Sequence, residues 1–542
     1  MITPSSVVLG PPGCGKTHAM LEVVQDALSR SVSPTRIGFF TFTRAARQEA
    51  RERVCRNLGI GESSLPWFRT IHSAAARALP AGARDFMDDG AWREFGQRHG
   101  YAFTAVHGDP YLTPRRTPGD EFRSAYDLAR NTQLSEKDWG RVRPRNYSSR
   151  AFQGFVSRLE AFKAEGHRLD FCDVLQSALL EAPPFHLDVA LVDEAQDLSP
   201  LQIAVVEHWL GDCPEVHLAG DDDQAVFGFQ GANPAWLQDL AGRFPTRRLS
   251  QSYRVPRAVH ALAERIIGRN RGRLDKPYEP ANRDGEVLRL GLAQAIDDAL
   301  SVPDGETVLV LARNRTFLTA PARELMRRGV PFLVEGAGGP NPLGDVRLVD
   351  SVALMFRLAQ GEIGCTARQL QELLRFISVG PLCPRGVKAA VKKAASDHRG
   401  FSQKELRDEL RLGVLLDALG EGRQFDLLVK ASKETRMYLE RVWGDSVLPP
   451  DPIVRLTTIH GAKGREAKQV ILLDSMSKRS YQAYTDRRPG AVDLENRLFY
   501  VGATRARERL LIVSKPGGKR YDFPSTGSDG RAAASLVNGG PA

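Results

Sequence analysis

The chain has 542 residues, 42% hydrophobic and 8% aromatic, so it is too long for one compact domain and predicts about three or four globular domains. It lacks an apolar run that could cross a bilayer, and its start lacks a secretory signal, so we expect a cytoplasmic protein of a bacterial or phage-infected cell, associated with the nucleoid. The formal net charge of +10 points to a polyanionic partner. The six cysteines are scattered and form no C-x-x-C pair, which favours reduced thiols over a zinc site or a disulfide framework.

The first part of the chain is typical of a parallel α/β unit. A short apolar strand at 7–9 is followed by a glycine-rich turn and an amphipathic helix at 18–28. A second apolar strand at 37–42 and a helical stretch at 44–54 follow at the spacing of a βαβ unit.

The pattern changes between about residues 80 and 150, where helices are broken by Pro and Gly. Residues 113–150 contain nine Lys or Arg against five Asp or Glu, so this insert is basic. Buried strands at 189–192 and 216–219 then restore the α/β pattern, and both end in acidic residues.

A second α/β series starts with strands at 287–290 and 307–312 and ends with strands at 454–458, 470–473 and 510–513. A mostly helical stretch lies within this second series, and a Gly-, Ser- and Ala-rich tail follows it. We therefore predict two α/β cores, each interrupted by a helical insert. The expected parts are 1–79 and 166–248 for the first core, 80–165 for its basic insert, 249–339 and 451–515 for the second core, 340–450 for its insert and 516–542 for a disordered tail.

The glycine-rich turn carries the phosphate-binding pattern G-x-x-x-x-G-K-[ST] between a strand and a helix. Its glycines let backbone N–H groups face phosphate oxygens, Lys16 suits the β- and γ-phosphates, and the Thr17 hydroxyl suits Mg²⁺. A chance glycine-rich turn is the alternative, and the flanking elements argue against it. The predicted nucleotide loop consists of Gly10, Pro11, Pro12, Gly13, Cys14, Gly15, Lys16 and Thr17.

Asp193 and Glu194 directly follow the strand at 189–192. Asp193 is placed to hold the magnesium shell, and Glu194 to orient and deprotonate the attacking water. Solvated loop charges are the alternative, and the phosphate-binding pattern favours the catalytic interpretation.

Three consecutive carboxylates, residues 221–223, follow the next strand and precede Gln224. Because like charges repel, we expect a nearby cation or basic cluster to compensate them. Gln224 can hydrogen-bond a γ-phosphate or its attacking water. Phosphoryl transfer also needs cations, and the candidates are Arg254 and Arg505.

The ordered series of motifs resembles the UvrD/Rep family of superfamily 1 helicases, and the resemblance runs from residue 10 to about 513. It implies two RecA-like P-loop NTPase domains, each with an inserted mainly helical subdomain, that bind ATP and Mg²⁺ between them. The matching segments are GPPGCGKT, FTFTRAARQEA, RTIHSAAARAL, LDFCDVL, LVDEAQDLSPLQ, AGDDDQAVFGFQGA, LSQSYRVP, VRLTTIHGAKGREAKQVILL and ENRLFYVGATRARERLLIV.

The resemblance also implies roles for single residues. Arg254 and Arg505 would reach the γ-phosphate, Tyr253 would stack on the base, and Glu466 would approach the ribose. The residues that match single-stranded DNA contacts are Phe42, Thr43, His72, Phe227 and Phe229. Core packing is the alternative for the phenylalanines. If the segment is extended, the Phe-x-Phe spacing puts Phe227 and Phe229 on the same side, and the neighbouring glycines favour an exposed loop.

The chain departs from the family pattern at two positions. It has no Gln before Gly10 to read adenine, so nucleotide preference stays open, and Phe229-Gln230 replaces a Trp-Arg pair. The sequence as a whole predicts an ATP-dependent 3′-to-5′ DNA helicase that acts on single-stranded DNA and duplex junctions. The alternatives are an ATP-driven protein–DNA remodelling factor with little unwinding and an RNA-directed translocase.

Overall fold

The chain forms two compact units in the computed structural model. Met1–Arg289 with Thr458–Ala542 make up the first unit, and Leu290–Thr457 the second. In the part of the chain that the structure describes, no helix is both long and apolar enough to cross a membrane. The described residues are 2–42, 44–79, 85–103, 117–301, 306–335, 341–361, 364–444, 448–515 and 517–525.

A parallel sheet with the strand order β3-β2-β6-β7-β1-β8 lies in the N-terminal part of the first unit. It contains the strands predicted near residues 7, 37, 189 and 216, which are thereby confirmed. Because β6, β7 and β1 are neighbours, the loops that follow them leave the same edge of the sheet side by side. The strands are β1 (Ser6–Leu9), β2 (Ile37–Thr41), β3 (Phe68–Thr70), β6 (Val189–Val192), β7 (Glu215–Gly220) and β8 (Thr246–Arg248).

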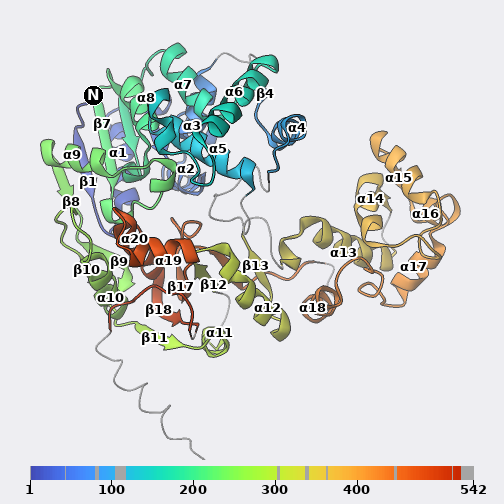
Figure 1. Ribbon diagram of the computed structural model, residues 1–542. Helices are drawn as coiled ribbons and strands as arrows, with labels where there is room; N and C mark the ends of the chain where they lie inside the picture. The colour runs from blue at the N-terminus through green and yellow to red at the C-terminus, as the bar shows by residue number, and fades with distance from the viewer. Residues whose placement is uncertain are drawn as a thin grey trace, which may run out of the picture. The chain divides into compact units, whose positions relative to one another are not determined.

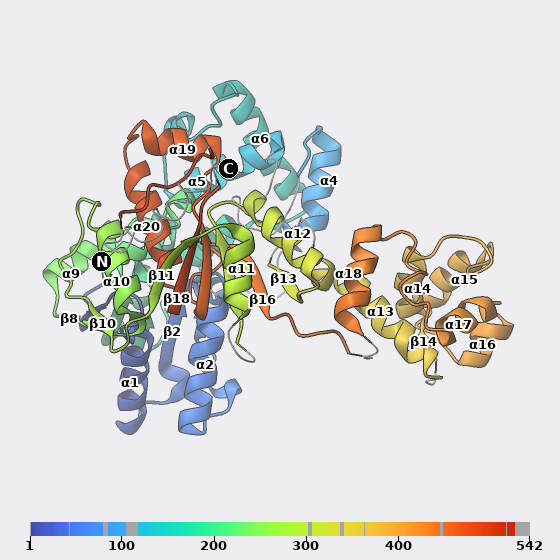
Figure 2. The same ribbon diagram turned by 90° about the horizontal axis from the view of Figure 1, so that it is seen from below.

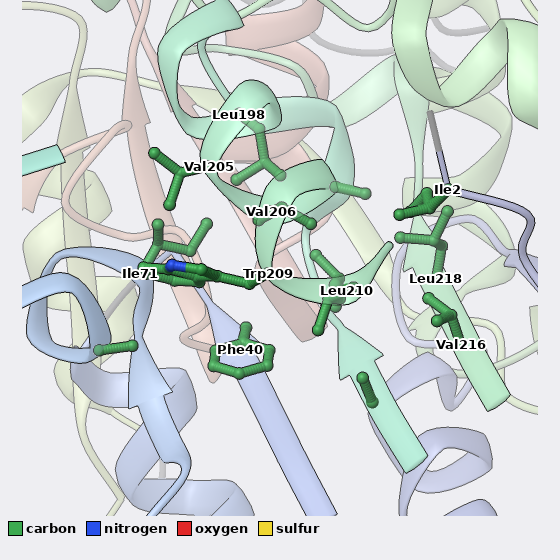
Figure 3. Packing of buried hydrophobic residues seen from close by; sticks show 14 of the residues in the cluster. Ile2, Phe40, Ile71, Leu198, Val205, Val206, Trp209, Leu210, Val216 and Leu218 are labelled. Carbon is green, nitrogen blue, oxygen red and sulfur yellow. The ribbon is translucent and has the colours of Figure 1, made fainter. Parts of the chain in front are cut away.

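This sheet is buried on both faces, as parallel sheets require. Leu9 packs on one face with Phe40 and Trp209, whereas Val8 packs on the other with Phe39. Figure 3 shows Trp209 beside the ring of Phe40, and the two ring centroids are 6.1 Å apart. The covering helices are α3 (Ile71–Ala78), α7 (Phe171–Glu181), α8 (Pro200–Leu210) and α9 (Ala235–Arg243) on the Trp209 face, and α1 (Lys16–Ser29) and α2 (Arg44–Leu58) on the other.

The basic insert has an aromatic core of its own. Trp92, Phe95, Phe122 and Phe155 are buried together, and Thr117 caps the second of its helices in a capping box. The helices expected in this stretch are confirmed among the described residues. They are α4 (Asp89–His99), α5 (Pro118–Asn131) and α6 (Ser149–Glu165), accompanied by β4 (Asp85–Phe86) and β5 (Arg168–Leu169).

The rest of the first unit holds parallel strands and the helices packed on them. In β17 and β18, Ile471 lies opposite Leu511, and Figure 1 shows α19 and α20 next to each other in red. These elements confirm the strands predicted near 287, 470 and 510. They are β9 (Gln251–Pro256), α10 (Arg257–Ile267), β10 (Glu279–Ala281), β11 (Glu286–Leu290), β17 (Ala467–Leu473), α19 (Lys478–Thr485), α20 (Ala491–Ala503) and β18 (Ala506–Val513).

The second unit combines parallel strands with a helical region. Phe332 of β13 lies opposite Val454 of β16, and Figure 2 shows α14 to α17 gathered in one group. The mostly helical stretch predicted between 340 and 450 is confirmed where it is described. The elements are α11 (Leu292–Leu300), β12 (Val308–Ala312), α12 (Thr319–Arg328), β13 (Phe332–Val334), α13 (Val346–Ala359), β14 (Cys365–Thr366), α14 (Ala367–Phe376), α15 (Val387–Ser396), β15 (Gly400–Phe401), α16 (Gln403–Asp408), α17 (Gly413–Gly420), α18 (Lys433–Trp443) and β16 (Val454–Thr458).

Part of the tail differs from the expectation of disorder. Tyr521 and Phe523 are 1% and 5% exposed, and the Tyr521 ring stacks on Phe499 of α20 at 4.1 Å. The Tyr521 hydroxyl donates a hydrogen bond to Asn496 Oδ1 at 2.6 Å. Two aromatic rings thus bury enough apolar surface to anchor residues 517–525 despite the Gly- and Ser-rich composition. Residues 516 and 526–542 of the predicted tail lie outside the described residues, and the domain boundaries predicted above stay predictions.

Candidate nucleotide site and nucleic-acid track

The predicted phosphate loop lies between β1 and α1, directly at the carboxyl edge of the first sheet. Gly13 and Gly15 both adopt positive φ, at 78° and 81°, which a side chain would disfavour. A Cβ on Gly13 would also lie 2.5 Å from the Cβ of Arg254, so only glycine lets β9 approach the loop this closely. The motif glycines are therefore required by local geometry.

The threonine of the loop faces the carboxylate predicted to hold magnesium, whereas the lysine bonds within the loop. Lys16 Nζ donates to the carbonyl of Gly10 at 2.6 Å, and Thr17 Oγ1 donates to Asp193 Oδ2 at 3.2 Å. Burial and the neighbouring Glu194 raise the pKa of Asp193 to about 6. The structure thus brings together the hydroxyl and carboxylate oxygens that a hard cation prefers.

Glu194 has the left-handed backbone conformation, with φ 57°, which costs a non-glycine residue about 1–3 kcal/mol. Its carboxylate accepts a hydrogen bond from Gln196 Nε2 at 2.5 Å. Burial alone would raise the pKa of Glu194, but the cations of Lys463 and Lys16 hold it below its ordinary value. An ionised, oriented carboxylate is the state in which Glu194 can accept a proton.

Gln224 and Arg505 meet at the same site. Gln224 Nε2 donates to Asp221 Oδ2 at 2.8 Å, and Arg505 Nη2 donates to Gln224 Oε1 at 3.1 Å. Arg505 is 1% exposed and also donates to the carbonyl of Val501. Burial and the charge of Arg254 lower the pKa of Arg505 to about 9, so its guanidinium remains charged at neutral pH.

The strand β9 presents the second predicted arginine. The backbone N–H of Tyr253 donates to Gly13 O at 2.9 Å, and the Tyr253 side chain is exposed. Arg254 Nε donates to the carboxylate of Glu466. Burial alone would raise the pKa of Glu466, but Arg254 holds it below its ordinary value. Tyr253 and Arg254 therefore lie next to the phosphate loop, and Glu466 contacts Arg254. The roles that the resemblance implies for them stay predictions.

The cation expected beside the three carboxylates is present. Lys276 contacts Asp221, Asp222 and Asp223, and Arg273 forms two hydrogen bonds to Asp223. Sequence reasoning predicted a cation here without identifying Lys276 or Arg273, because neither belongs to a recognised motif.

Lys463 is a further site residue that sequence reasoning missed. Its ammonium donates to the carboxylate of Asp197 and to Gln224 O at 2.9 Å, and lies 3.5 Å from Glu194 Oε2. Burial lowers the pKa of Lys463, but the carboxylates of Asp197 and Glu194 outweigh burial and hold it above its ordinary value. Its place in the segment HGAKGRE was the available signal.

A row of aromatic rings adjoins this site. Phe227 lies 4.7 Å from Phe42, 5.9 Å from Phe229 and 6.0 Å from His460, measured between ring centroids. His460 was also missed, and it too belongs to the segment HGAKGRE.

The exposed loop expected for Phe227 and Phe229 does not hold for Phe227. Residues Gly228–Gln230 form a 3₁₀ turn, closed by hydrogen bonds from Gln230 N and Ala232 N to Phe227 O. Phe227 is consequently buried, at 8% exposed, while Phe229 is half-buried. Phe229 is thus the more accessible of the two rings.

His72 contacts a different ring: its half-buried imidazole meets the edge of Phe171, with the ring centroids 5.6 Å apart. Burial lowers the pKa of His72 to about 4, so the ring is neutral at pH 7. Thr43, the remaining residue of the predicted track, lies outside the described residues.

Comparison with known proteins identifies the family of the chain. The model of the UvrD/REP helicase N-terminal domain matches residues 2–245, and that of the UvrD-like helicase C-terminal domain matches residues 444–516. The chain is 25% identical to ATP-dependent DNA helicase UvrD2 of Mycobacterium tuberculosis (strain ATCC 25618 / H37Rv), over 96% of this chain and 78% of the relative. It is 24% identical to DNA helicase II of Escherichia coli (strain K12), over 94% and 82%.

A crystal structure of the arterivirus nonstructural protein 10 (helicase) aligns with 94% of this chain and 59% of its own chain, at 13% identity. The TM-score of this alignment is 0.32, which is too low to support an argument about function. The family models, in contrast, together cover more than half of the chain and contain the phosphate loop, the acidic motifs and Arg505. The chain therefore belongs to the UvrD/Rep helicase family.

Proposed function

We propose that this protein is an ATP-dependent DNA helicase that moves 3′ to 5′ along single-stranded DNA and separates strands at duplex junctions. One observation carries the proposal: Lys463 contacts the hydrolysis site and the aromatic row at once. Its ammonium bonds to Asp197 and Gln224 O and lies 5.7 Å from the centroid of the Phe227 ring. A change at the phosphates can therefore reach the rings through a single side chain.

ATP hydrolysis follows from the roles that the geometry supports. Glu194 accepts the proton of the attacking water, and Gln224 Oε1 orients that water or senses the γ-phosphate. Arg254 and Arg505 stabilise the charge that develops on the γ-phosphoryl group. Lys16 neutralises the β- and γ-phosphates from within the loop.

Magnesium is the metal that this site fits. The Thr17 hydroxyl and the Asp193 carboxylate are both oxygen ligands, and they lie within hydrogen-bonding distance of each other. Thr17 and Asp193 would hold Mg²⁺, which supplies neutralising charge to the phosphates when bound.

The aromatic row gives a sequence-tolerant grip on unpaired bases. Each stacked base contributes about 1–3 kcal/mol, so a few accessible rings suffice without reading base identity. Phe229 is the main candidate, because Phe227 is more deeply buried. The 3′-to-5′ polarity and the choice of DNA over RNA rest on the family.

The test is ATP hydrolysis with single-stranded DNA, with single-stranded RNA and without polynucleotide, followed by unwinding of duplexes that carry a 3′ or a 5′ tail. We expect stimulation by DNA and unwinding from the 3′ tail alone. Stimulation without unwinding would favour a protein–DNA remodelling factor, and stimulation by RNA alone an RNA-directed translocase. If neither polynucleotide stimulates hydrolysis, the proposal is wrong.

A further inference from the structure

The carboxylates of Asp221, Asp222 and Asp223 are buried at the end of β7, each 1% exposed or less. The Lys276 ammonium lies 3.1 Å from Asp221 Oδ1 and 3.1 Å from Asp223 Oδ2, and it also pairs with Asp222. The Lys276 side chain is itself 2% exposed, so it is an internal counter-charge rather than a surface pair. Arg273 adds a second cation, at 2.7 Å from both oxygens of Asp223.

Of these three carboxylates, Asp221 is joined to the hydrolysis site. Its Oδ1 accepts from Asp223 N at 3.2 Å and faces Lys276, and its Oδ2 accepts from Gln224 Nε2 at 2.8 Å. Because an ionised carboxylate only accepts hydrogen bonds, the group of Gln224 that faces it must be the amide NH₂. The opposite atom, Gln224 Oε1, then faces Arg505.

The charge of Asp221 depends on its cations. Burial alone would raise the pKa of Asp221, but Lys276 and then Lys16 hold it below its ordinary value. Without the Lys276 ammonium, Asp221 would lose the cation that it contacts. Arg273 bonds Asp223, and Lys16 would remain as the weaker cation acting on Asp221. Protonation of Asp221 would then let it donate a hydrogen bond, and the Gln224 amide could turn over.

The segment that carries Lys276 is tied to both nucleotide motifs. Leu274 N donates to Asp222 Oδ2 at 2.9 Å, and the Tyr278 hydroxyl donates to Pro12 O of the phosphate loop at 3.4 Å. The lysine therefore sits on a backbone that is itself held against the site, with little freedom to withdraw.

From these contacts we propose that Lys276 is a positioning residue for ATP hydrolysis. It keeps Asp221 as a pure acceptor, and Asp221 in turn holds the Gln224 amide with Oε1 toward Arg505 and the γ-phosphate. This inference rests on the proposed ATP hydrolysis and adds to it the residue that sets the orientation of Gln224.

The experiment measures kcat and KM for ATP in Lys276→Met and Asp221→Asn, each in a Gln224 and a Gln224→Ala background. Asp221→Asn preserves the size of the side chain. The new NH₂ group would face Gln224 Nε2, and because two NH₂ groups cannot hydrogen-bond each other, the Gln224 amide would turn over. In the Gln224 background, we expect either change to lower kcat about tenfold or more, while KM for ATP stays within about threefold of the wild-type value. In the Gln224→Ala background, we expect either change to alter kcat less than about twofold.

Arg273→Met is the matched control, because it removes a cation from the same cluster without contacting Asp221; its kcat should stay within about twofold of wild type. Lys276→Arg should restore most of the lost kcat. Melting temperatures identify a variant that fails to fold. If Lys276→Met fails to fold, the kinetics of Asp221→Asn test the inference instead. Equal losses of kcat in both backgrounds would overturn the inference.

Failure of the inference is distinguishable from failure of the proposed function. Wild-type protein that hydrolyses no ATP, or gains nothing from DNA, contradicts the proposed function. Wild-type hydrolysis in which Lys276 and Gln224 act independently contradicts this inference alone.

Discussion

Arg505 Nη2 donates to Gln224 Oε1 at 3.1 Å, although the two residues lie 281 positions apart in the chain. The contact joins the start of β18 to the turn after β7, so a cation from the end of the chain reaches the carboxyl edge of the first sheet. Both side chains are buried, so bulk water competes little with this hydrogen bond.

Replacement of Arg505 tests this contact. Arg505→Ala should lower kcat for DNA-stimulated hydrolysis about 10³-fold or more, because it removes a cation from the developing charge on the phosphoryl group. Arg507→Ala is the matched control, since Arg507 is half-exposed and lies 3.7 Å from Glu466 Oε1. Steady-state kinetics measure both, and a similar loss in the two variants would contradict the assignment.

Glu194→Gln should separate nucleotide binding from hydrolysis. The amide keeps the size of the side chain but cannot accept the proton of the attacking water, so kcat should fall about 10²- to 10⁴-fold. The affinity for ATP, measured by titration with a fluorescent analogue, should change little. Retention of kcat within a few-fold would exclude Glu194 as the general base.

The pKa of Asp193 predicts how activity depends on pH. Burial and Glu194 raise this pKa to about 6, so below that pH Asp193 is protonated and a poor magnesium ligand. The value of kcat/KM should therefore fall as the pH decreases through about 6. Because Mg²⁺ favours the ionised form, a higher Mg²⁺ concentration should move the midpoint to lower pH. An unchanged midpoint across Mg²⁺ concentrations argues against Asp193 as the ligand.

Phe229→Ala tests the aromatic row. Loss of one stacking ring should weaken binding of single-stranded DNA by about 1–3 kcal/mol, whatever the base sequence. Phe86→Ala is the control, because Phe86 is an exposed ring on β4 in the insert. Fluorescence anisotropy with labelled oligonucleotides gives both affinities, and equal affinities for Phe229→Ala and wild type would remove Phe229 from the track.

The anchored tail makes a prediction about stability. Tyr521→Ala should cost about 3–5 kcal/mol, because it removes a buried ring from Phe499. Tyr521→Phe should cost about 1 kcal/mol, because it keeps the ring but loses the hydrogen bond to Asn496. Urea unfolding of both variants measures the difference, and equal costs would show that the ring contributes little.

The sequence by itself determined the phosphate loop, the strands that carry the acidic residues and the family. These features are local: Gly13 and Gly15 need positive φ for the loop, and short apolar runs before Asp193 and Asp221 mark buried strands. The demand for a cation beside residues 221–223 was also readable, since repulsion among adjacent carboxylates is a property of the segment alone.

The tertiary structure decided which side chains meet. The neighbouring positions of β6, β7 and β1 bring three distant loops to one edge, and the return of the chain places Lys276, Lys463 and Arg505 against them. An isolated lysine has no local pattern that distinguishes an internal counter-charge from a surface residue, so Lys276 could not be identified from sequence, whereas Lys463 had the signal of its segment HGAKGRE. The turn at Phe227 was not predicted for a similar reason. Its conformation depends on ring contacts with Phe42 and His460, which are distant in the sequence, together with hydrogen bonds within the turn.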